Sequence, residues 1–321
     1  MCIRDSHQAA WSVDADAALK PLFRLARDGE DAALIRALSD IADRTDWPRP
    51  ARDRVLHAFA VGLGDLDMGA VGGDVLDYLE SLEAGTWVPL EDHPDTAIPL
   101  FNVSAAASGV RNAWRRQAAA ATSGQYLAVG SQAWLDRFIG LGPTERQGML
   151  DGLEGLEPGL LRQLGESALP RLGQAPALTA VAARAGLLLR DALIFSQAVA
   201  LGSGPGLTPS LRAASDHFNA AQSLAILEHV IDAAPDGNAS LALAQLAPVC
   251  LHEPAVADLL FETLEDRRLG ATAALVLAGS SDGTVRERLR QTAAADQSLA
   301  AKRAALALTT TRWPEPGAKQ R

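Results

Sequence analysis

Apolar residues in the C-terminal third of the chain recur at the spacing of one face of an α-helix. In 220–231 they stand at offsets of 0, 4, 7 and 11 residues, which places their side chains on one side of a helix. Pro235-Asp236-Gly237-Asn238 then has the residue types of a turn. Similar faces follow over 241–251, 256–264, 269–277, 285–289 and 299–308. The pattern predicts consecutive helices joined by short turns.

These predicted helices form pairs that repeat along the chain. Aligning Leu260 with Leu289 gives an offset of 29 residues, and aligning Ala273 with Ala304 gives 31. A repeat of about 30 residues built from two helices is typical of an α-solenoid, in which each hairpin stacks on its neighbours. We find no sustained alternation of apolar and polar residues between hairpin turns, so strands are not expected. The predicted fold class is all-α, a superhelix of stacked antiparallel helical hairpins.

The segment from about 254 to 310 resembles HEAT-like repeats, a family of short helical hairpins. The resemblance is carried by PAVADLL at 254–260, in the first helix of a hairpin, and by GATAALVLA at 270–278, in the second. It agrees with the solenoid that the repeat period predicts and covers the clearest part of the pattern.

The N-terminal half is also predicted to be helical, with less regular spacing. The longest stretch without a helical pattern is 85–99. The Gly-, Pro- and Ser-rich tract 202–210 is the best candidate for a linker. We therefore expect an irregular helical region over 7–201 and HEAT-like repeats over 211–312. We interpret residues 1–6 (MCIRDS) as a translated sequencing-adapter artefact, and we expect 313–321 to be a disordered tail.

Composition narrows the classes of function. Hydrophobic residues make up 48% of the 321 residues, aromatic residues only 5%, and 62 residues are alanine, which favours closely packed helices. The net charge of -10 argues against a nucleic-acid partner, because binding to phosphates needs a cationic surface. No uninterrupted apolar run has the length of a membrane-spanning helix.

Motifs of familiar cofactor and metal sites are missing from the sequence. None of the lysines follows a glycine, which excludes a phosphate-binding loop of the Gly-Lys-Ser/Thr type. With only Cys2 and Cys250, neither a disulfide framework nor a thiolate metal site is expected. We therefore predict no catalytic residue, no metal and no cofactor.

One group of polar and aromatic residues is a candidate binding site. Its members are Trp87, Asp92 and His93 in the non-helical stretch, and Arg111, Trp114 and Arg115 in the helix predicted to follow. As a site, the carboxylate and imidazole would handle an ion or a proton, and the arginines would bind an anionic group. In the simpler interpretation, Trp87 packs against the helices while carboxylates of the loop pair with the arginines.

Three functions agree with these observations. The repeat period and the missing catalytic motifs favour a non-catalytic scaffold that binds another protein through the concave face of the solenoid. The second is a helical-repeat hydrolase or lyase with a small polar site around Asp92, His93 and Arg111. The third is an accessory subunit of a cell-envelope assembly. The expected location is cytoplasmic or periplasmic.

Overall fold

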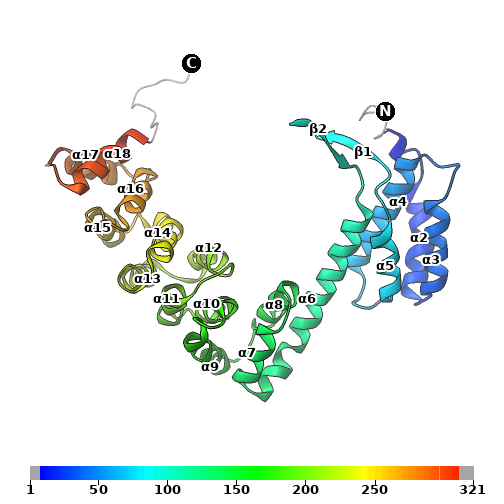
Figure 1. Cartoon of the computed structure of the whole chain (residues 1–321), viewed down its shortest axis with the longest axis horizontal. Helices are drawn as coiled ribbons and strands as arrows, with labels where there is room; N and C mark the ends of the chain where they lie inside the picture. Colours follow the sequence, from blue (N-terminus) through cyan, green and yellow to red (C-terminus); the bar gives the residue numbers. More distant parts are fainter. Residues whose placement is uncertain (1–7, 91, 296, 311–321) are drawn as a thin grey trace. The chain divides into compact units, whose positions relative to one another are not determined.

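The computed structural model describes residues 8–90, 92–295 and 297–310. Helices make up most of these residues, in agreement with the periodicity of the sequence (Figure 1). The chain divides into two compact units. The first holds the residues up to 121 together with 142–149, and the second holds 122–141 and the residues from 150 onward.

The first unit is a group of helices that pack against their sequence neighbours. Helix α2 contacts α3 and α4, and α3 contacts both α4 and α5. Leu34 and Leu38 are fully buried and Ile41 nearly so, as their spacing predicts. The core around them includes Phe59, and α6 adds Trp114. The helices are α2 (Ala15–Arg27), α3 (Asp31–Ala42), α4 (Arg49–Gly62), α5 (Gly73–Ser81), the first part of α6 (Val103–Val129) and most of α8 (Pro143–Asp151), with the short 3-10 helix η1 (Leu63–Asp65).

A β-hairpin stands where no strand was expected, and it corrects the predicted all-α class to mostly α. Strand β1 (Trp87–Leu90) pairs antiparallel with β2 (His93–Pro99), from Trp87 opposite Pro99 at one end to Leu90 opposite His93 at the other. Prolines at 89, 94 and 99 hid the strands from sequence analysis, because proline is unfavourable in most sheets. A two-stranded sheet has two open edges, where a residue without an N–H is tolerated.

Thr86, the residue before β1, joins the hairpin to α4. The Thr86 hydroxyl donates a hydrogen bond of 2.8 Å to Oδ2 of Asp53, and the Thr86 carbonyl accepts one of 2.8 Å from the N–H of Leu100. Burial raises the pKa of the Asp53 carboxyl, and the bond from Thr86 opposes that shift. These contacts supply stability that an isolated two-stranded hairpin lacks in water.

The second unit is a succession of helices in two layers. Helices α10, α12, α14, α16 and α18 contact one another in that order, and α11, α13 and α15 do the same beside them (Figure 1). The elements are α7 (Ser131–Ile139), α9 (Pro158–Ala168), η2 (Leu169–Arg171), η3 (Pro176–Leu178), α10 (Thr179–Leu189), α11 (Ala192–Leu201), α12 (Leu207–His217), α13 (Ala220–Ala233), α14 (Asp236–Cys250), α15 (Pro254–Thr263), α16 (Gly270–Ala278), α17 (Gly283–Ala295) and α18 (Leu299–Thr310).

Small residues allow these helices to approach closely. Ala182, Ala183 and Ala185 of α10 are fully buried. A Cβ atom added at Gly186 would lie 2.8 Å from the backbone nitrogen of Phe195 in α11. The abundance of alanine and glycine therefore serves packing between helices as well as helix propensity.

The tract 202–210 lies inside the second unit, so the predicted linker does not coincide with the division of the structure. The Ser203 N–H donates to Oγ1 of Thr179 at 3.0 Å, and the Asn238 amide donates to the Gly202 carbonyl at 2.8 Å. Helix α12 already begins at Leu207. The glycines and prolines of this tract form a tight connection between packed helices. A Gly- and Pro-rich composition is the same in such a connection and in a linker between domains.

Two further predictions fall outside the described residues: the artefact segment 1–6 and the tail 313–321. Among the described residues, no helix has both the length and the apolar character needed to cross a membrane.

Candidate functional site

The hairpin half of the predicted site is exposed. Asp92 and His93 lie at the turn end of the hairpin, and both side chains face solvent. Trp87, at the other end of β1, is 56% exposed. Its indole Nε1 donates a hydrogen bond of 3.0 Å to the Ala84 carbonyl. Trp87 therefore does not pack into the helices as the simpler interpretation expected.

The three residues of the predicted site on α6, Arg111, Trp114 and Arg115, lie in different environments. Nε of Arg111 lies 2.8 Å from Oε1 of Glu80, and Nη2 lies 2.5 Å from Oδ1 of Asp77, so α5 supplies both carboxylates. The hydrogen bond that Arg111 donates to Glu80 is the main cause that raises the pKa of the Arg111 guanidinium. Trp114 is buried in the core of the unit. Arg115 is exposed and lines a cavity of about 380 Å³ beside Arg111.

The structure does not bring the six predicted residues together. Within the described residues, no hydrogen bond or ion pair joins Arg111 to Asp92 or His93. The carboxylates that pair with Arg111 come from α5 and not from the hairpin, which corrects the simpler interpretation. Sequence separation concealed this pairing, because Glu80 and Arg111 meet only through tertiary packing. The described part of the chain also holds no cluster of three or more His, Cys, Asp or Glu side chains suited to a metal ion.

His57 is a titratable group of the first unit that the sequence did not single out. Its ring lies 5.8 Å from that of Phe101, and burial lowers its pKa below 6.5. The unfolded chain therefore binds a proton more readily than the folded chain, so stability is lost as the pH falls through about 6.5.

We expect the urea midpoint of the wild type to fall between about pH 7 and pH 5, and the fall to be smaller in His57→Phe, since phenylalanine cannot take up the proton. Unfolding curves of both proteins across this pH range test the effect. An equal fall in the two proteins would show that His57 is not its source.

The strongest candidate surface lies in the second unit, on α14 and α16. The segments 237–251 and 269–281 contain no Asp, Glu, Lys or Arg, although such residues make up 21% of the chain. Both segments nevertheless reach the surface: Val249 of α14 is 51% exposed and Leu275 of α16 is 63% exposed. An uncharged surface on two adjacent helices is unusual for a face that only meets water.

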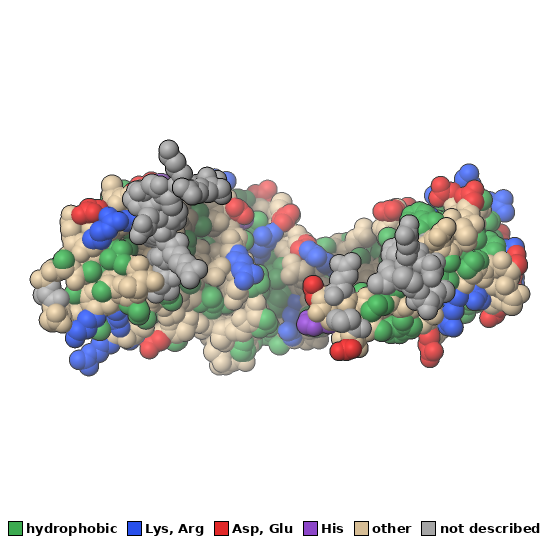
Figure 2. All heavy atoms as spheres, turned by 90° about the horizontal axis from the view of Figure 1, so that it is seen from above, with side chains coloured by type: hydrophobic (Ala, Val, Ile, Leu, Met, Phe, Trp, Pro, Cys, Tyr) green, Lys and Arg blue, Asp and Glu red, His purple; other side chains and the backbone are tan. Residues whose placement is uncertain are grey.

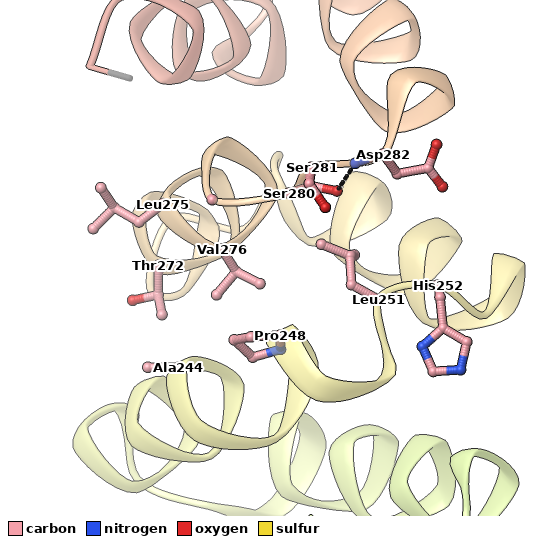
Figure 3. Close-up of a pocket in the computed structure, with 11 residues that line it drawn as sticks. Ala244, Pro248, Leu251, His252, Thr272, Leu275, Val276, Ser280, Ser281 and Asp282 are labelled. Atoms are coloured by element: carbon pink, nitrogen blue, oxygen red, sulfur yellow. Dashed lines mark hydrogen bonds between the residues drawn. The ribbon is translucent and has the colours of Figure 1, made fainter. Parts of the chain in front are cut away.

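A groove of about 460 Å³ lies between these helices (Figure 3). Pro248 and Val276 lie on opposite walls of this space, from α14 and α16 respectively. The Thr272 hydroxyl lies 3.2 Å from the Ser240 hydroxyl and links the two helices. The remaining lining residues are Ala244, Leu251, His252, Leu275, Gly279, Ser280, Ser281 and Asp282.

One end of the groove is polar and negatively charged. The Asp282 N–H donates a hydrogen bond of 3.1 Å to the Ser280 hydroxyl, drawn as a dashed line in Figure 3. The Asp282 carboxylate accepts hydrogen bonds of 2.8 Å from the Thr284 N–H and hydroxyl. Those two bonds lower the pKa of Asp282, so its carboxylate is ionised at neutral pH. None of the described residues that line the groove is lysine or arginine.

Exposed apolar residues extend the groove surface along the layer. Ala244, Leu275 and Leu306 are each separated by 31 residues and lie on α14, α16 and α18, which contact one another in succession. All three are exposed. We call these residues, together with Pro248 and Val249, the apolar row. The signal that could have revealed it in the sequence is the absence of charge over the two segments on α14 and α16.

Several charged side chains of the described residues form pairs of opposite sign. On the face seen in Figure 2, acidic and basic side chains are interspersed. Arg288 pairs with Asp258 and Arg290 with Glu287, so these arginines are partly neutralised by their neighbours.

No protein-family model matches the chain, and no curated protein or solved structure is significantly similar to it. The resemblance to HEAT-like repeats therefore stays a prediction.

Proposed function

We propose that this protein is a non-catalytic scaffold of HEAT-like helical hairpins, stacked as an α-solenoid, that binds a segment of another protein along the apolar row. The observation that carries the proposal is the exposure of Leu275 and Val249 on two adjacent helices that carry almost no charge. The succession of contacts from α10 to α18 supports the solenoid, because stacked repeats bury their cores against their neighbours.

The geometry indicates what kind of segment would bind. Large apolar side chains of the partner would enter the groove beside Pro248 and Val276, since burial of one such side chain contributes about 1.5–3 kcal/mol. Ser281 and Asp282 at the polar end would fix its orientation through hydrogen bonds. An extended or helical peptide that combines apolar and basic residues fits this surface.

Selection from a random peptide library tests the proposal. We expect the full chain to enrich peptides with apolar and basic residues, and Leu275→Arg to weaken their binding by about tenfold or more, because it loses apolar burial and adds a charge that must be desolvated. The matched control is Leu193→Arg, since Leu193 is 60% exposed on α11, in the other layer.

Circular dichroism should show both variants folded. Peptides that bind Leu275→Arg as tightly as the wild type would contradict the proposed surface, as would equal losses in the two variants.

A further inference from the structure

The C-terminal end of α18 lies on the side of the second unit that carries the groove. Nη1 of Arg303 donates hydrogen bonds of 2.6 Å to the carbonyls of Leu264 and Asp266, just before α16. The Ala300 N–H donates to the Glu265 carboxylate at 3.1 Å. The first half of α18 therefore lies beside the connection that leads from α15 into α16. Since the two helices contact each other, their C-terminal ends lie on the same side of the unit, where Gly279 and Asp282 border the groove.

The chain continues from this position with a short basic segment. Residues 311–321, which lie outside the described residues, have the sequence TRWPEPGAKQR. They contain Arg312, Lys319 and Arg321 against one acidic residue, Glu315, which gives a net charge of 3 − 1 = +2. Trp313 is their one large apolar side chain.

We propose that the segment 311–321 occupies the groove of its own chain, with the Trp313 side chain between α14 and α16. A tryptophan can bury about 150–250 Å² of surface, and the groove measures about 460 Å³. Three extended residues from Thr310 to Trp313 span about 10 Å. Packed helix axes lie about 8–10 Å apart, so this length is enough to cross from α18 to α16. The indole ring extends beyond it toward the groove.

Charge complementarity favours the same occupant. Among the described residues that line the groove, Asp282 is the one acidic residue, and none is lysine or arginine. Arg312, next to Trp313 in the sequence, would bring a positive charge to this end. In the free protein the segment would then shield apolar surface, and a partner that binds the apolar row would have to displace it. Occupation of the groove by the segment does not itself require such a partner.

Fluorine NMR of the full chain labelled with 5-fluorotryptophan tests this proposal without a partner. The chain has 6 tryptophans, and Trp313→Phe identifies the resonance of Trp313. We expect this resonance to differ from that of a synthetic peptide covering 311–321. It should move to the peptide position in Leu275→Arg and stay in place in Leu193→Arg, with both variants folded by circular dichroism.

Two results would overturn the proposal: a wild-type resonance already at the position of the free peptide, or one that Leu275→Arg leaves unmoved. A resonance that changes on dilution would also contradict it, because the segment would then bind a second copy. The peptide selection reports separately on the proposed function. In Trp313→Ala, which leaves the groove free, selected peptides should bind several-fold more tightly than to the wild type.

Discussion

Replacement of Trp134 by alanine is expected to lower the free energy of unfolding by about 3–5 kcal/mol. Trp134 is fully buried in α7. Its ring stacks on Phe138 with centroids 5.2 Å apart and planes at 12°. The indole Nε1 also donates a hydrogen bond of 3.0 Å to the Ser123 hydroxyl. Alanine would leave a cavity and remove the donor to a fully buried hydroxyl.

Urea unfolding followed by far-UV circular dichroism measures this loss. The matched control is Trp87→Ala, in which the removed ring is 56% exposed, and we expect a change of about 0.5 kcal/mol or less. Trp134→Phe should fall between the two, because it restores apolar volume and lacks the donor. Equal midpoints for Trp134→Ala and Trp87→Ala would mean that burial of Trp134 contributes little.

Gly186→Ala is expected to destabilise the second unit by about 1–3 kcal/mol, although alanine is the better helix former. The new methyl group would lie 2.8 Å from the nitrogen and 2.9 Å from Cα of Phe195. Both are backbone atoms, so relief requires α10 and α11 to move apart. Phe195 is itself fully buried and contacts Phe218 with ring centroids 5.1 Å apart, so the displacement would disturb the surrounding core.

Gly237→Ala, the same chemical change at another position, is expected to raise the free energy of unfolding. Gly237 lies in the first turn of α14, and no atom lies within 4 Å of an added Cβ. We expect a gain of about 0.4–1 kcal/mol, because alanine restricts the unfolded chain and favours the helix. If the two substitutions shift the urea midpoint in the same direction, close approach at Gly186 is not the deciding factor.

Much of the helical structure could be predicted because its signal is local. The apolar spacing over 220–231 corresponds to α13, and the segments 254–260 and 270–278 correspond to α15 and α16. Leu260, Leu277 and Leu289 are buried as their spacing predicts. Each of these predictions depends only on residues within one or two helical turns of each other.

The hairpin could not be predicted in this way. Val88 is buried between exposed neighbours, which is the alternation of a strand, but β1 is only four residues long. Pro89 further obscured the signal, since proline normally argues against a strand. The pairing of Val88 with Ile98 depends on a partner segment, which short-range patterns do not report.

The sequence by itself determined the mostly helical character, the short turns between successive helices and the use of alanine in their packing. These features follow from the periodicity and propensity of neighbouring residues. Only the tertiary structure decided which side chains meet: Arg111 pairs with α5 and not with the hairpin, and Pro248 and Val276 border one groove. Contacts between distant segments depend on how the helices pack. The spacing of apolar residues shows which face of a helix is apolar, but not which other helix that face contacts.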